Sequence, residues 1–114
     1  MQNKIKQIKT GSSFYEVEYK REVLNAQNRA LLGQTDLDNE IIEINTDFPP
    51  FIQLKILHHE GTHTIFAEYD LYSSKDKDAR ENEVAKFSNA FLTFAIDNPE
   101  FIRKILRYAE RIKK

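Results

Sequence analysis

The order of hydrophobic and polar residues changes along the chain, and this change predicts strands first and helices afterwards. Between residues 14 and 20 every second side chain is apolar, namely Tyr15, Val17 and Tyr19. This alternation indicates a strand with one buried face. Turn-forming residues and then a β-branched run fill residues 33–44, so that segment is predicted to be a hairpin.

The second half of the chain has the spacing of helices. Pro50 suits the first position of a helix, and the apolar run of residues 51–68 contains no other proline, so one helix of about five turns is predicted there. Asn98 and Pro99 supply the cap and the first residue of another helix. We expect that last helix to bury its apolar positions, which are Ile102, Ile105, Leu106, Ala109 and Ile112.

A further helix is predicted between these two, over residues 81–96. Its apolar residues recur at i, i+3, i+4 and i+7, which places them on one face. We expect the phenylalanines of this face to lie in the core, and the polar segment 71–80 to reverse the chain before it. The apolar face consists of Phe87, Ala90, Phe91 and Phe94.

The predicted elements place the chain in the α+β class. We expect one domain over residues 1–114, in which a small antiparallel sheet lies beside the helix of residues 51–68, with the other two helices behind it. Residues 1–12 are expected to be loosely ordered, because they are polar and end in a turn. Residues 21–32 fit either a short helix or a loop.

Candidate chemistry lies in the helix of residues 51–68, which carries the HExxH motif His59-Glu60-Gly61-Thr62-His63. Residues four apart lie on one helix face, so the imidazoles of His59 and His63 can reach one metal ion. Glu60 lies about 100° around the helix from His59, beside the ligands rather than among them. Its predicted role is that of a general base that takes a proton from a metal-bound water.

A third metal ligand is expected from the next predicted helix. Glu83 lies four residues before Phe87, at the head of the apolar face, where an unpaired carboxylate would be costly. Glu81 is the main competitor, because residues two apart on a helix cannot share a face. The chain has no cysteine, so His, Asp or Glu must supply every ligand. Two histidines and Glu83 form a set that suits Zn²⁺ and leaves a fourth position for water.

These residues resemble the ImmA/IrrE-type metallopeptidases and their small phage-borne relatives. The similarity rests on the runs of residues 57–63 and 81–88, and it extends loosely to residues 32–36 and 41–44. It implies a minimal zincin-like fold. It also implies a role for each matching residue: His59, His63 and Glu83 as zinc ligands, and Glu60 as catalytic base.

The motif and the resemblance together predict a zinc-dependent metallopeptidase. The resemblance implies a regulatory protease of a phage or mobile element, acting on a repressor-type regulator or another specific protein. We expect an extended substrate to pair with an edge strand near residues 41–44 and to lie across the metal. One alternative is a catalytically silent, zinc-stabilised protein-interaction module with the same ligands. Another is an inactive domain that binds nucleic acid through the basic face of its last helix.

Charge and hydropathy narrow the classes of partner. The chain has 17 basic and 18 acidic residues and a net charge of -1, which argues against nucleic acid as the main partner. No segment has the roughly 20 apolar residues of a membrane span, and the N-terminus lacks the apolar run of a signal peptide. We therefore expect a cytoplasmic protein without membrane contact. The oligomeric state does not follow from the sequence.

Other residues near the motif have more than one potential role. Tyr69, Tyr72 and Tyr108 each offer a hydroxyl that could stabilise a developing oxyanion, and the sequence does not distinguish them. His58 is expected to be structural or exposed, because it points to another side of the helix from His59.

Overall fold

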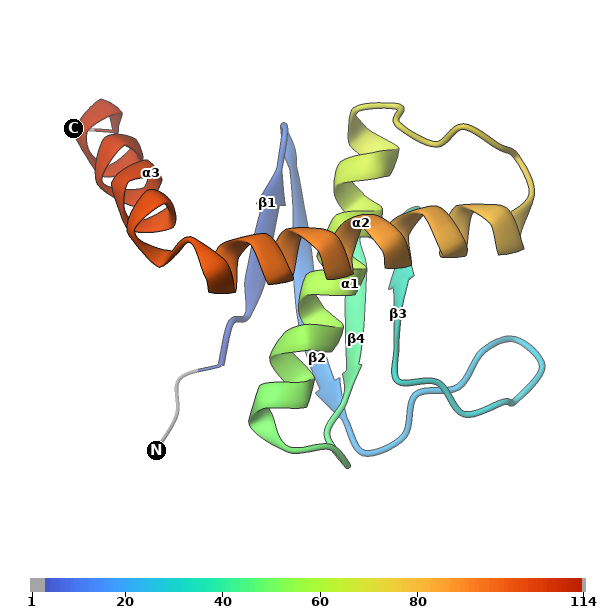
Figure 1. The fold of residues 1–114 in the computed structure, drawn as a ribbon. Coiled ribbons are helices and arrows are strands. Elements are labelled where there is room, and N and C mark those ends of the chain that lie inside the picture. Colours follow the sequence, from blue (N-terminus) through green and yellow to red (C-terminus); the bar gives the residue numbers. More distant parts are fainter. Residues whose placement is uncertain (1–3, 114) are drawn as a thin grey trace.

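The computed structural model describes residues 4–113 and has an α+β architecture (Figure 1). Four strands form one sheet, and three helices follow them in the chain. The order of strands first and helices afterwards is the one that the hydrophobic pattern predicts, whereas β1 was not expected. The elements are β1 (Gln7–Thr10), β2 (Ser13–Lys20), β3 (Gly33–Asp36), β4 (Ile41–Asn45), α1 (Pro50–Glu68), α2 (Lys77–Asp97) and α3 (Pro99–Ile112).

The sheet is mixed, with the strand order β1-β2-β4-β3. The pairs β1/β2 and β3/β4 are antiparallel, whereas β2 and β4 run parallel. The predicted hairpin of residues 33–44 is therefore confirmed, but the expectation of a wholly antiparallel sheet is wrong. Because β4 lies between β2 and β3, it is an internal strand, and β3 forms an edge of the sheet. An irregular segment, residues 21–32, connects β2 to β3.

The N-terminal part of the chain joins the sheet. Residues 7–10 form β1, which pairs with β2 around a turn at Gly11. Gly11 has a φ of 59°, a conformation that glycine adopts without steric cost. The expectation of loose order over residues 1–12 is thus wrong for β1, and residues 1–3 lie outside the described part of the chain.

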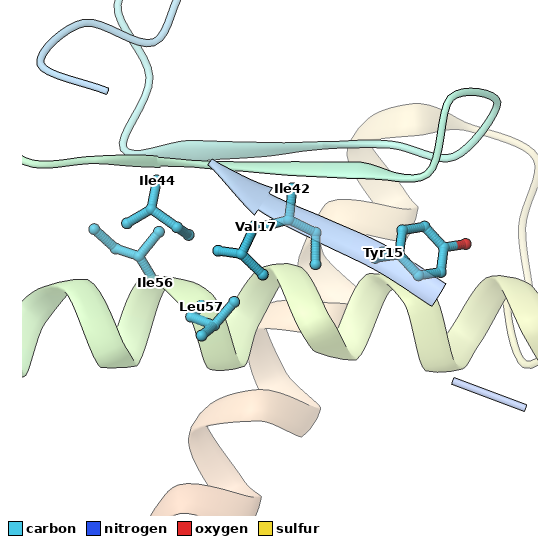
Figure 2. Close-up of a cluster of buried hydrophobic side chains, with 6 residues drawn as sticks. All are labelled: Tyr15, Val17, Ile42, Ile44, Ile56 and Leu57. Carbon is cyan, nitrogen blue, oxygen red and sulfur yellow. The ribbon is translucent and has the colours of Figure 1, made fainter. Parts of the chain in front are cut away.

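The core lies between α1 and one face of the sheet (Figure 2). The face of β2 that the sequence pattern predicts to be buried is the one that packs on α1, and the alternate side chains point away from it. Burying one apolar side chain of this size stabilises the folded state by about 1.5–3 kcal/mol. The central cluster consists of Tyr15, Val17, Ile42, Ile44, Ile56 and Leu57.

The helix boundaries follow local signals. Pro50 is the first residue of α1, as predicted, and the helix ends at Glu68. α2 begins four residues before its predicted start, because the Asp76 carboxylate caps it by accepting a hydrogen bond from the backbone N–H of Ala79 at 2.9 Å. Asn98 precedes α3, but its side chain donates to the carbonyl of Phe94 instead of capping α3.

The helices form two further layers on the sheet. α2 crosses α1 on the side away from the sheet, and α3 extends from the end of α2 (Figure 1). The side chains of α2 that pack towards α1 and become buried are Val84 and Ser88. The expectation that the phenylalanines of α2 lie in the core is therefore wrong, since they are about half exposed. The expectation that α3 buries its apolar face is also wrong, because no residue of α3 is buried.

Across residues 4–113, none of the helices combines the length and the apolar character needed to cross a membrane.

Candidate metal centre

The two histidines of the HExxH motif lie together on α1. Their ring centroids are 5.1 Å apart, as expected for residues one helical turn apart. Glu60, next to His59 in sequence, lies on another side of the helix and is buried against β3. The motif thus presents two imidazoles to α2 and one carboxylate to the edge of the sheet.

Glu81 of α2 contacts both histidines. Its Oε1 lies 2.6 Å from Nε2 of His59, and its Oε2 lies 2.9 Å from Nε2 of His63. One atom from each of the three side chains lies within 4.8 Å of the other two. The group is half open to solvent, because Glu81 is exposed while both imidazoles are largely covered.

Glu83 has a different partner. Its carboxylate accepts hydrogen bonds from the backbone N–H of Ser73, at 3.1 and 3.3 Å. The structure therefore brings Glu81 to the histidines, in place of the predicted Glu83. The reason is the orientation of α2: Glu81 lies three residues before Val84 and shares the stripe that packs on α1. Glu83 shares the stripe of Phe87, which is half exposed.

The contacts of Glu81 set its charge state. Hydrogen bonds from His59 and His63 hold the pKa of the Glu81 carboxyl well below its usual value. The hydrogen bond to Glu81 in turn raises the pKa of His59. The Glu81 carboxylate therefore stays negatively charged beside Nε2 of both histidines. A divalent cation bound between these three groups would be stabilised by that charge.

Glu60 is buried beside this group. Burial raises the pKa of its carboxyl, while the hydrogen bond from Thr35 and the nearby histidines oppose that rise. The Thr35 hydroxyl donates to Oε1 of Glu60 at 2.8 Å. Sequence reasoning assigned no role to Thr35, and nothing local could have shown one, since its partner is 25 residues away.

Tyr72 orients His63 from the loop between α1 and α2. Its hydroxyl lies 2.7 Å from Nδ1 of His63. When Nδ1–H donates to this hydroxyl, Nε2 keeps its lone pair for a metal. Among the three candidate tyrosines only Tyr72 lies at the site. Tyr69 lies beside Gly11, and Tyr108 is exposed on α3.

His58 faces away from the group, as predicted. Its Nδ1 lies 2.7 Å from the hydroxyl of the buried Ser88, and its ring stacks on Phe91 with centroids 5.6 Å apart. Burial lowers the pKa of His58. These contacts fix the crossing of α1 and α2, and so position Glu81 opposite the two histidines.

Two pockets flank the group. The first, of about 450 Å³, is mainly apolar, with walls that include Leu31, Leu32, Ile52 and Ile56. The second, of about 490 Å³, is more polar, and its walls include Gln34, Tyr72, Lys77 and Arg80. Both pockets are lined by Gly33, Glu60 and Glu81, so the edge strand β3 passes from one to the other beside the candidate site.

Gly33 allows β3 to approach α1 closely. A Cβ atom on Gly33 would lie 2.7 Å from Cγ2 of Ile56 and 2.8 Å from the carbonyl oxygen of Glu43. The second distance is to a backbone atom, so a side chain at this position would require the backbone to shift. The close approach places Thr35 within reach of Glu60.

The donor set fits a zinc ion. Two imidazoles and one carboxylate are the ligands of many catalytic zinc sites, and they leave one position free. Bonds of about 2.0–2.2 Å to a tetrahedral ion place the ligand atoms roughly 3.3–3.5 Å apart. The three atoms already lie within 4.8 Å of one another, so small side-chain rotations are enough to admit an ion.

Comparisons of the chain with protein-family models, with curated proteins and with solved structures find no match in any of the three. The resemblance to ImmA/IrrE-type metallopeptidases therefore stays a prediction from the motif.

Proposed function

We propose that this chain is a zinc-dependent peptidase with a minimal zincin-like architecture. In this proposal His59, His63 and Glu81 hold the zinc ion, and Glu60 is the general base. The observation that carries it is the convergence of the three ligand atoms within 4.8 Å, beside a buried carboxylate and between two pockets. Glu81 thus replaces Glu83, the third ligand predicted from the sequence.

The chain's own residues suit hydrolysis in several ways. A zinc ion held by these ligands would act as a Lewis acid that activates water and polarises a carbonyl. The raised pKa of Glu60 brings its carboxyl nearer to neutral pH, where a base accepts protons most effectively. Thr35 holds that carboxylate in one orientation, and Tyr72 does the same for the ring of His63.

The substrate in this proposal is an extended segment of a specific protein, such as a repressor-type regulator. It pairs with the edge strand β3, because β4, which includes the predicted residues 41–44, is internal. An apolar side chain then enters the pocket between Leu31 and Ile56, while the chain continues past Arg80. Peptides with an N-methylated backbone near the cleaved bond should resist hydrolysis, and equal cleavage would remove strand pairing from the proposal.

The metal is tested first. Purified protein is loaded with zinc, and its metal content is measured by elemental analysis together with Glu81→Gln and Glu83→Gln. About one zinc per chain is expected in the wild type and in Glu83→Gln, with most of it lost in Glu81→Gln. If Glu81→Gln kept its zinc and Glu83→Gln lost it, this ligand set would be wrong.

The reaction is tested next with Glu60→Gln, which keeps the shape of the side chain but removes the base. A peptide library analysed by mass spectrometry should show cleavage by the wild type and a loss of about 10²–10⁴-fold in the variant. The rival reading, a catalytically silent zinc-stabilised interaction module, predicts no cleavage by either protein, and a zinc-dependent rise in melting temperature in both.

A further inference from the structure

α2 and α3 expose one continuous series of apolar side chains, here called the seam. Aromatic residues recur at every seventh position, and a second series lies four residues after them, with Asn98 taking one place at the junction between the helices. The exposed fraction of each apolar member is between 44% and 65%. The seam consists of Phe87, Phe91, Phe94, Phe101, Ile105, Tyr108 and Ile112.

The fold covers the seam only at its α2 end, where Phe66 meets Phe87 edge to face with centroids 5.7 Å apart and His58 stacks on Phe91. α3 packs mainly against α2, and within residues 4–113 no side chain of α3 is buried. At the bend between the helices, the rings of Phe94 and Phe101 meet edge to face with centroids 5.9 Å apart. An isolated helix of 14 residues is marginally stable in water, so α3 needs a partner for its apolar face.

The spacing indicates that this partner is a helix. Apolar residues at alternating intervals of four and three form the contact line of packed helix pairs. The bend between α2 and α3 is visible in Figure 1, and the contact of Phe94 with Phe101 places the seam on the inner side of that bend. A flat bilayer surface cannot contact α2 and α3 at the same time on the concave side of this bend, whereas a helix can pack on each of them.

The charges beside the seam differ between the two helices. On α3 the residues directly before Ile105 and Ile112 are basic, namely Lys104 and Arg111. On α2, Asp97 directly precedes Asn98, and Glu83 lies one helical turn before Phe87, so the charges beside that part of the seam are acidic. Two copies of α3 facing each other would oppose basic residues. A copy of α3 lying along α2 of another chain would oppose basic and acidic residues, which favours that pairing.

We infer that the seam is the interface of a two-fold homodimer, in which α3 of each chain packs antiparallel on α2 of the other. Seven half-exposed side chains of this size offer about 700 Å² of apolar area per chain. A stable interface buries about 800 Å² per partner, of which roughly 60% is apolar. The seam is therefore large enough for a dimer. The seam begins six residues after Glu81, whose carboxylate faces the two histidines of α1.

The mass of the full chain in solution tests this inference, by light scattering after gel filtration at increasing concentration. The expected mass is twice the 13.4 kDa of one chain. Ile105→Glu, at the centre of α3, should raise the dimer dissociation constant by about 100-fold. The matched control is Ile96→Glu, which is 70% exposed but outside the seam. It should change the constant less than about threefold.

A charge exchange identifies the partner as a second copy. Lys104→Glu and Asp97→Lys should each weaken self-association, whereas an equal mixture of the two variants should form a heterodimer at least about tenfold tighter than either homodimer. Circular dichroism checks that each variant is folded.

Three results would overturn the inference. One is a wild-type protein that remains a monomer at about 100 µM. Another is an equal effect of Ile105→Glu and Ile96→Glu. The third is a folded monomer that binds vesicles of anionic phospholipid through the seam.

Discussion

The hydroxyl of Thr35 donates a hydrogen bond to the carboxylate of Glu60 at 2.8 Å, and it lies 3.2 Å from the backbone oxygen of the same residue. This contact joins the edge of the sheet to the buried acid of α1. A carboxylate in such a place needs a donor, because an unpaired buried charge is costly. Thr35 therefore determines both the orientation of Glu60 and part of its acidity.

Replacing Thr35 by valine removes this donor while keeping the shape of the side chain. Because the hydrogen bond lowers the pKa of Glu60, its loss should raise that pKa further. A base works only when deprotonated, so the acid limb of the rate–pH profile should move to higher pH, with zinc content unchanged. Thr93→Val, at an exposed position of α2, is the control. An acid limb that stays in place would separate Thr35 from the action of Glu60.

Tyr72→Phe should weaken zinc binding by about 10- to 100-fold, because the hydroxyl that orients His63 is lost. The protein should remain folded, since the phenylalanine ring can keep the contact with Phe66. Competition with a chelator gives the affinity. Tyr108→Phe removes an exposed hydroxyl from α3 and should leave the affinity unchanged. Equal effects of the two changes would contradict the role of Tyr72.

The metal-free protein should show a stability optimum that depends on Glu81 and His59. The lowered pKa of Glu81 contributes stability above its ordinary value of 4.5, which is lost as the pH falls. The raised pKa of His59 contributes stability below its ordinary value of 6.5, which is lost as the pH rises through the folded-state pKa. The contribution of the pair is thus greatest between pH 4.5 and 6.5.

Urea unfolding at a series of pH values with a chelator present measures this effect. The difference in unfolding free energy between wild type and Glu81→Gln should peak in that interval and fall on both sides. Glu60 has a raised pKa, so its own contribution to stability decreases as the pH rises. Both proteins contain Glu60, and this contribution therefore cancels in the difference between wild type and Glu81→Gln. Zinc binding should depend on pH in a different way. Protons compete with the metal for the two imidazoles, so zinc affinity should fall below about pH 6.5. A flat difference across pH would contradict the pairing.

Two glycines near the site should respond oppositely to alanine. Gly33→Ala places a methyl group 2.8 Å from the carbonyl oxygen of Glu43, so it should destabilise the fold by about 1–3 kcal/mol. Gly61→Ala meets no atom within 4 Å and lies inside α1, so it should stabilise by about 0.5–1 kcal/mol. Thermal unfolding measures both. A stabilising Gly33→Ala would show that β3 does not approach α1 this closely.

The elements whose causes are local could be predicted from the sequence. Pro50 and an uninterrupted apolar run specify α1, and four-residue spacing places His59 and His63 on one face of it. Alternation specifies the buried face of β2, and turn residues specify the β3–β4 hairpin. Each of these features depends on residues within a few positions of one another.

Tertiary packing decided the rest. Parallel pairing of β4 with β2 made β3 the edge strand, and that brought Thr35 to Glu60. The third side chain at the histidines depends on which stripe of α2 packs on α1. Hydrophobicity alone favoured the phenylalanine stripe and therefore Glu83, whereas close packing buries the smaller Val84 and Ser88 and so presents Glu81. Helix periodicity defines the faces of α2, but only the fit of two surfaces selects between them.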